Sequence, residues 1–220
     1  MMPYLSLAIW VPIVAGLAVL AVGRDRDAAA ARWIALAGAL AGFIVTLPLW
    51  LHFDGSTSNM QFVERSEWIP RFDIHYLLGV DGISMLFVLL NSLMTLFVVW
   101  SAWEVIQTRV AQYMAAFLIQ SGLINGAFCA LDGILFYMFF EAMLIPMYII
   151  IGAWGGPNRV YAALKFFLYT LLGSLLMLVA LIYLYNVSET FSILEWHHVP
   201  LSMKVEVLLF VEFLLSFAVK

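Results

Sequence analysis

The chain has 220 residues, of which 65% are hydrophobic and only 11% are charged, and its formal net charge is −4. A soluble domain is typically about 45–50% apolar and about 25% charged, so this composition excludes a large soluble domain and predicts a membrane protein with several spans. The sequence contains no basic patch with interleaved aromatic residues, and we expect no nucleic-acid partner.

Apolar runs of spanning length recur along the whole chain and predict an all-α transmembrane bundle of about seven helices. The first run has no positive residues before it, so we expect a membrane helix and not a cleaved signal peptide. The predicted spans are residues 3–22, 32–51, 76–101, 111–130, 133–153, 160–185 and 204–220. The last run stops at Lys220 before it reaches full spanning length, and we expect the chain to be part of a longer protein.

Basic residues are unevenly distributed between the two sets of connections. The first, third and fifth connections, with the start of the span that follows each, carry Arg24, Arg26, Arg32, Arg109, Arg159 and Lys165. The opposite side carries Arg65, Arg71 and Lys204. Because an excess of Lys and Arg marks cytoplasmic connections, we predict that the N-terminus and the polar connection at 52–75 lie outside.

Ionisable residues also fall within the spans or at their edges, where a charge is costly unless it faces the bundle interior, a partner or water. They are Asp81, Asp132, Glu141, Lys165, Glu206, Glu212 and Lys220. Asp81 and Asp132 stand where helix caps stand, and Lys165 is close enough to the interface to extend toward it. Glu141 lies roughly 13 Å of helix from either interface and has no such exit.

A proline follows this carboxylate on the same span. Pro146 cannot donate a backbone hydrogen bond and therefore frees the carbonyl group of Ala142, one residue after Glu141. We expect a kinked span beside a buried carboxylate, which is a place where water can find hydrogen-bond partners.

No ligand set for a redox centre is recognisable. The histidines fall in or beside outer connections, whereas a b-type haem needs axial histidines within the spans. There is no Cys/His spacing for a metal, no glycine-rich phosphate loop and no nucleophile motif. Buried carboxylates and lysines without redox ligands predict an ion or proton path, because the proton affinity of a buried lysine changes when its carboxylate partner moves.

Several stretches resemble one family of membrane subunits. They are "DGILFYMFFEAMLIPMYIIIGAWGG", "RVYAALKFFLYTLLGSLLMLVALIYLY", "YLLGVDGISMLFVLLNSLM" and the closing "FLLSFAVK". Together they resemble the subunit M family of the proton-translocating NADH–quinone oxidoreductase, respiratory complex I, whose mitochondrial counterpart is subunit 4. The resemblance covers nearly the whole chain and is clearest from Tyr76 onward.

The resemblance implies an antiporter-like fold with fourteen helices and two inverted five-helix repeats. Residues 1–110 would hold the first three helices, and residues 111–220 most of the first repeat, helices four to the start of seven, with the second repeat missing. The proton-path residues of the family fall on Glu141, Lys220 and Lys165. Glu212 departs from the family pattern. We predict that the side chains of Glu141 and Lys220 face each other, directly or through a water molecule.

The resemblance also implies a role within a larger assembly. This chain would be one proton-pumping module with no cofactor and no metal of its own, while other subunits bind NADH, FMN, iron–sulfur clusters and quinone. Its partners would be the other membrane subunits, especially neighbouring antiporter-like ones, and the lipid bilayer. It would be a multi-pass protein of the bacterial inner membrane with a periplasmic N-terminus.

Two alternatives remain open from the sequence. A subunit of a multisubunit sodium/proton antiporter would share the fold and the glutamate–lysine arrangement. A membrane scaffold protein without an ion path would tolerate neutralisation of Glu141 or Lys220.

Overall fold

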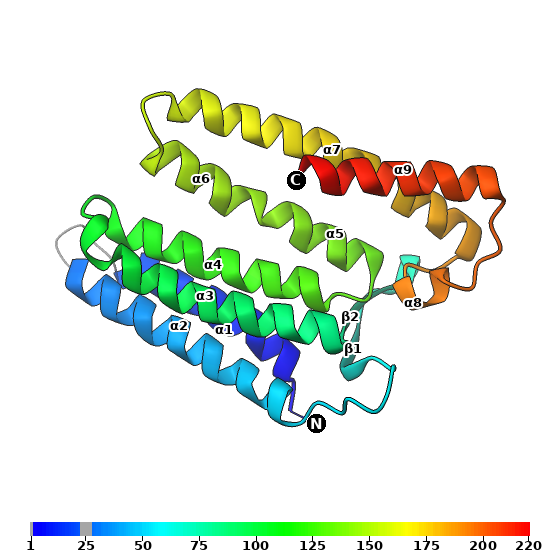
Figure 1. Ribbon diagram of the computed structural model, residues 1–220, viewed down its shortest axis with the longest axis horizontal. Helices are drawn as coiled ribbons and strands as arrows, with labels where there is room; N and C mark the ends of the chain where they lie inside the picture. The colour runs from blue at the N-terminus through cyan, green and yellow to red at the C-terminus, as the bar shows by residue number, and fades with distance from the viewer. Residues whose placement is uncertain (1, 23–27) are drawn as a thin grey trace. The chain divides into compact units, whose positions relative to one another are not determined.

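The computed structural model describes residues 2–22 and 28–220, and most of its elements are helices (Figure 1). Their bounds are α1 Tyr4–Val22, α2 Ala28–Leu51, β1 Gln61–Ile69, the 3-10 helix η1 Pro70–Phe72, β2 Ile74–Val80, α3 Gly82–Val105, α4 Val110–Cys129, α5 Gly133–Ala142, α6 Leu144–Trp154, α7 Arg159–Ser188, α8 Ile193–Trp196 and α9 Met203–Val219. Arg24 and Arg26, which entered the count of basic residues, lie outside the described residues.

The predicted spans coincide with helices, except that the start predicted for the third span, 76–101, is wrong. The first residues of this run belong to strand β2, and helix α3 begins only after Asp81. The Asp81 side chain accepts the backbone N–H groups of Ile83 and Ser84 at 3.1 and 2.7 Å, and the Ser84 hydroxyl accepts the Asp81 N–H at 2.9 Å. This capping box fixes the start of the helix, whereas the apolar run continues unchanged from strand to helix.

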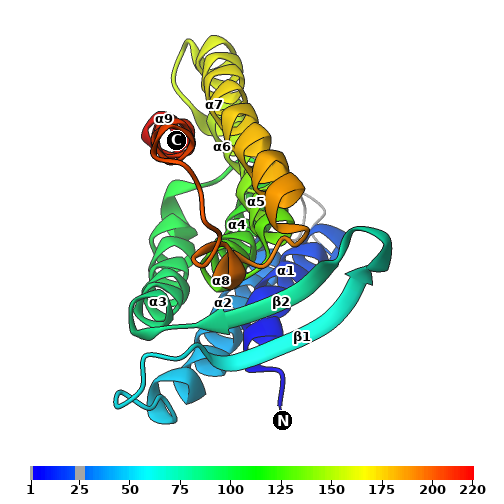
Figure 2. The ribbon, with the colours of Figure 1, turned by 90° about the vertical axis from the view of Figure 1, so that its right-hand side faces the viewer.

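The polar connection predicted at 52–75 contains most of a β-hairpin. Figure 2 shows β1 and β2 side by side as a long curved ribbon. The turn between them includes Asp73 in the left-handed conformation (φ 53°), which aspartate tolerates better than most residues. Near the base of the hairpin, the Glu64 carboxylate accepts the N–H groups of Leu5 and Ser6 at 2.8 and 3.1 Å. It therefore caps the first turn of α1, where a negative charge is favourable.

Five helical segments among the described residues are long and apolar enough to cross a membrane. They are Tyr4–Val22, Ala28–Leu51, Gly82–Val105, Gly133–Trp154 and Arg159–Ser188. The other two predicted spans are helices as well, but α9 has only 17 residues and α4 carries several polar side chains. The chain is a membrane-spanning helix bundle.

The chain divides into two compact units. Unit 1 contains Met1–Glu64 and Leu78–Cys129, and unit 2 contains Arg65–Leu77 and Ala130–Lys220. In unit 1, α4 packs against α1, α2 and α3. In unit 2, α7 packs against α5, α6 and α9. These units are defined by the segments that pack together. The division predicted at 110/111 is based instead on the five-helix repeat that the resemblance implies, and it stays a prediction.

Helix α4 is the most buried helix of unit 1 and lies very close to α1. A Cβ atom added at Gly122 would overlap the backbone carbonyl oxygen of Ile9 and the side chain of Ile13. Small residues at such positions let transmembrane helices approach closely, and this packing is a main source of helix association in membranes. Gly122 therefore sets the distance between α1 and α4.

A buried polar network connects the same helices. Pro12 lies inside α1 and cannot donate to the Ala8 carbonyl group one turn earlier. The Asn125 side-chain amide of α4 donates to this carbonyl at 3.0 Å. Asn91 of α3 donates to the Asn125 side-chain oxygen at 2.8 Å. Asn125 is fully buried, so the network satisfies a backbone carbonyl group that would otherwise have no partner.

We expect Asn125→Leu to destabilise the folded subunit, because it leaves the Ala8 carbonyl without its donor and removes the side-chain oxygen that accepts from Asn91. A buried unsatisfied polar group costs on the order of 1–3 kcal/mol, which should lower the thermal unfolding midpoint measured in detergent. Asn186→Leu is a matched control, because the exposed Asn186 amide donates within its own helix, to the Ile182 carbonyl. Equal midpoints for the two variants would contradict the role of the network.

Candidate functional site

The span that carries Glu141 is interrupted between helices α5 and α6. Helix α5 ends at Ala142 and α6 begins at Leu144, with Met143 between them. Pro146 provides the physical reason, because its ring removes the N–H that would bond the Ala142 carbonyl. The predicted distortion beside the carboxylate is confirmed. The backbone hydrogen bond that the Ala142 carbonyl would accept in a regular helix is missing next to Glu141.

Glu141 and Lys220 lie together in unit 2. The Lys220 Nζ is 3.8 Å from the Glu141 Oε1, and only 13% and 19% of the two side chains are exposed. The prediction that the two side chains face each other is confirmed. Because 3.8 Å is longer than a direct hydrogen bond, the two groups form an ion pair without a shared proton.

The lysine has a second set of partners on α5. Its ammonium group donates to the backbone carbonyl of Phe140 and lies 3.2 Å from the centroid of the Phe140 ring. The Glu141 Oε1, in contrast, is buried without a hydrogen-bond partner among the described residues. Lys220 can therefore either remain on Phe140 or move toward the carboxylate, and the carboxylate has an open position for a proton, a water molecule or the ammonium group.

Aromatic rings surround the pair on α5 and α9. Phe136 stacks on Phe140 with centroids 5.3 Å apart, and Phe217 meets Phe140 edge to face at 5.7 Å. These rings keep the surroundings of the pair apolar. In such surroundings electrostatic interactions are stronger than in water, and unpaired charges are correspondingly costly.

Two further polar side chains share one face of α9 with Lys220. Glu212, Ser216 and Lys220 are spaced four residues apart, so they follow one another along the helix. Ser216 is 1% exposed, and its hydroxyl has no partner among the described residues. Glu212 is half-buried, whereas Glu206 is exposed in the first turn of the same helix.

The structure does not bring Lys165 to the pair. Its side chain is exposed on α7, and its Nζ lies 5.9 and 5.7 Å from the rings of Tyr161 and Tyr169. The inner face of α7 carries Thr170 and Ser174 instead, both of which are buried. The assignment of Lys165 to a proton path stays a prediction.

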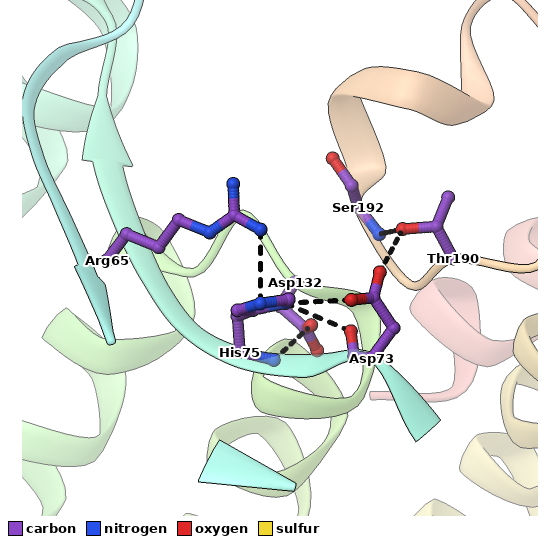
Figure 3. Close-up of polar contacts among 6 residues, drawn as sticks. All are labelled: Arg65, Asp73, His75, Asp132, Thr190 and Ser192. Atoms are coloured by element: carbon purple, nitrogen blue, oxygen red, sulfur yellow. Dashed lines mark hydrogen bonds and ion pairs between the residues drawn. The ribbon is translucent and has the colours of Figure 1, made fainter. Parts of the chain in front are cut away.

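A second polar cluster holds the start of α5 and was only partly foreseen from the sequence. Figure 3 shows Asp73, His75 and Asp132 converging, with Thr190 and Ser192 beside them. Asp132 is 1% exposed and accepts the N–H groups of Ile134, Leu135 and His75 at 2.9, 3.0 and 3.0 Å. The predicted cap is thus confirmed, and the bond to His75 is the part that sequence reasoning missed.

The histidine of this cluster has defined hydrogen-bond roles. Arg65 can only donate, so the His75 Nε2, 3.1 Å away, accepts from its guanidinium. The His75 Nδ1 then carries the proton and donates to the Asp73 carbonyl at 3.1 Å. Thr190 donates from its hydroxyl to the Asp73 carboxylate at 3.2 Å. The hairpin turn, the α5 start and the segment after α7 are therefore connected.

We expect Asp132→Ala to loosen this connection. The change leaves three backbone N–H groups without an acceptor, and loss of the cap alone costs about 1 kcal/mol. Hydrogen exchange measured by mass spectrometry should increase at the start of α5 and in the hairpin turn. Burial raises the pKa of the Asp132 carboxyl, and its backbone hydrogen bonds only partly oppose this shift.

One Asp132 carboxylate oxygen accepts both N–H groups at the start of α5, and the other accepts the His75 N–H. Asp132→Asn, which keeps one acceptor oxygen, should show a smaller increase in exchange than Asp132→Ala. Asp54→Ala, an exposed residue in the loop before β1, is the control and should leave both segments unchanged. Unchanged exchange in Asp132→Ala would contradict the anchoring role.

The chain is similar to several known membrane proteins. A family described as "NADH:quinone oxidoreductase/Mrp antiporter, TM" matches residues 130–220. The NADH-quinone oxidoreductase subunit M of Rhodobacter capsulatus is 46% identical over 98% of this chain and 45% of its own length. The chain thus spans about half the length of the curated relatives it matches.

The chain is also similar to chains of solved membrane complexes. A chain of respiratory complex I from Thermus thermophilus superposes with a TM-score of 0.85 at 30% identity, covering 97% of this chain and 43% of that one. A chain of the Mrp complex from Dietzia sp. DQ12-45-1b reaches 0.80 at 18% identity, covering 98% and 23%, and shares the fold alone. The chain therefore belongs to the antiporter-like subunit M family of the NADH–quinone oxidoreductases.

Proposed function

We propose that this chain is a proton-translocating membrane subunit of an NADH–quinone oxidoreductase. The observation that carries the proposal is the buried pair of Glu141 and Lys220 beside a broken span. A structural ion pair would not need an open carboxylate oxygen, and a scaffold protein would not need the pair at all. Carboxylates and lysines at this depth are costly, and they typically mark ion or proton pathways.

The geometry supports a two-position mechanism. With Lys220 on the Phe140 carbonyl and ring, Glu141 has an open oxygen that can accept a proton. When the ammonium group moves toward Glu141, its positive charge favours the carboxylate form, and Glu141 releases that proton. Movement of one ammonium group between two partners therefore changes the proton affinity of the carboxylate. Lys165 is proposed as a further member of the path, beyond this pair.

The energy for this movement would come from the rest of the assembly. We propose that NADH oxidation and quinone reduction take place in other subunits, which bind NADH, FMN, iron–sulfur clusters and quinone. Neighbouring antiporter-like subunits would transmit the conformational change to this chain. Proton pumping in inverted membrane vesicles tests the proposal: NADH should acidify the vesicle interior when quinone is available, and acidification should disappear when the chain is removed.

We predict an outside N-terminus, which in the bacterial inner membrane would be periplasmic. A membrane-impermeant thiol reagent added from the periplasmic side should label Ser56→Cys, and it should not label Gly156→Cys unless the membrane is opened. Both positions are exposed, and the native Cys129 is fully buried and should contribute little background. The reverse labelling pattern would overturn the orientation.

A second candidate is a subunit of a sodium/proton antiporter. The observation that favours it is the shared fold with the Mrp complex. The two functions differ in their energy source. If Na⁺ addition moves protons across the membrane without NADH, and NADH alone does not, the antiporter is the correct function.

A further inference from the structure

A small cavity with a distinctive composition lies in unit 1, far along the chain from the pair of charges. Its volume is about 380 Å³, within the range of small-molecule sites. We call it the tryptophan notch. The lining residues used below are Trp33 and Leu36 of α2 and Trp100, Trp103, Glu104 and Val105 of α3.

Three indole rings and one carboxylate meet at this notch. Trp33 and Trp103 meet edge to face with ring centroids 5.2 Å apart and an angle of 81° between their planes. Trp33 and Trp100 are 62% and 68% exposed. Glu104 follows Trp100 by four residues and therefore lies on the same face of α3. Aromatic faces together with a carboxylate form surroundings that favour a cation.

No cation of the described chain occupies this position. Among residues 2–22 and 28–220, Glu104 forms no ion pair. The nearby guanidinium of Arg32 instead donates to the Ile106 carbonyl and the Gln107 side-chain oxygen, at 3.0 and 3.2 Å. The notch thus presents negative charge and aromatic faces, and a fixed positive group lies beside it.

The notch also lies where lipid headgroups are found. Trp33 is near the start of α2 and Trp103 near the end of α3, and tryptophan at span ends is typical of the headgroup level. Toward the middle of the same spans, Leu40 of α2 and Phe97 of α3 are exposed apolar side chains. A ligand bound by its head at the notch could therefore extend its acyl chains along this surface.

We propose that the tryptophan notch binds the ammonium headgroup of a zwitterionic phospholipid, namely phosphatidylethanolamine. The ammonium group lies against the indole faces and Glu104, the phosphate faces Arg32, and the acyl chains follow the apolar surface of α2 and α3. The inference does not depend on proton translocation.

The test is photo-crosslinking in the native membrane assembly that carries the chain. The probe is a phosphatidylethanolamine with a diazirine at the top of one acyl chain, and crosslinked peptides are mapped by mass spectrometry. Labelling of peptides containing residues 33–36 and 100–105 should be displaced by unlabelled phosphatidylethanolamine at about tenfold lower concentration than by phosphatidylglycerol. N-acetyl-phosphatidylethanolamine, which lacks the ammonium charge, should compete as weakly as phosphatidylglycerol.

Two variants and one control separate the headgroup contact from general lipid contact. The measured quantity is the concentration of phosphatidylglycerol needed for displacement divided by that of phosphatidylethanolamine. Glu104→Gln should bring this ratio close to one, and Trp100→Leu should reduce it about threefold or more. Trp50→Leu, a similarly exposed tryptophan at the opposite end of α2, should leave it unchanged. Glu104 is an exposed surface residue, so its variant should fold even if Trp100→Leu does not. Equal competition by all three lipids, or a preference that persists in Glu104→Gln, would overturn the proposal.

Discussion

Glu141→Gln is expected to abolish or strongly reduce proton pumping and the quinone reduction coupled to it, while the assembly still forms. Glutamine has nearly the same shape and can accept a hydrogen bond, but it cannot take up and release a proton. Proton transfer by a positioned side chain typically contributes about 10²–10⁴-fold, so we expect a loss of at least about a hundredfold. Glu141→Asp should retain more activity, because it keeps a titratable carboxyl group one methylene farther from Lys220.

The matched control for this prediction is Glu206→Gln. It makes the same chemical change at an exposed residue of α9 and should leave pumping close to the wild-type rate. Activity is measured in vesicles as the rate of NADH-driven acidification per amount of assembled complex. Wild-type pumping in Glu141→Gln at a normal level of assembly would mean that this carboxylate carries no proton.

The second large effect concerns the coupling of Glu141 and Lys220. Lys220→Ala alone should reduce pumping strongly, because Glu141 then loses the ammonium group that draws it toward the charged form. In the double variant Glu141→Gln/Lys220→Ala, the loss should be clearly smaller than the sum of the single losses expressed as free energies. Residues in contact typically show coupling of about 0.5–3 kcal/mol.

A second double-mutant cycle, with a lysine at the opposite end of α9, provides the reference for additive losses. Combining Glu141→Gln with Lys204→Ala, an exposed lysine at the start of α9, should give losses that add. If the cycle with Lys220 is additive as well, the two charges act independently despite their 3.8 Å separation.

Glu141 could be singled out from the sequence by the cost of burying its charge, whereas its pairing with Lys220 was implied by the resemblance to the family. Glu141 is too far from either interface to reach water, and Pro146 must disturb the helix beside it. What the sequence did not contain is the second set of partners of Lys220. Lys220 reaches the Phe140 carbonyl because its side chain meets α5 close to the point where this helix ends.

The hairpin was harder to predict for a different reason. The strand residues before Asp81 are as apolar as the helix that follows, so hydropathy alone continues the span backward. The capping box at Asp81 was the available signal. The bond from the His75 backbone to Asp132 joins residues 57 positions apart, and no local pattern encodes such a contact.

The most direct test of the central claim is infrared difference spectroscopy on the assembled complex during turnover with NADH and quinone. If Glu141 takes up and releases a proton, a carbonyl stretching band of a protonated carboxylic acid should appear during turnover. This band should be absent in Glu141→Gln, shifted in Lys220→Ala and unchanged in Glu206→Gln. A spectrum of Glu141→Gln that retains every carboxylic-acid band of the wild type would contradict the account.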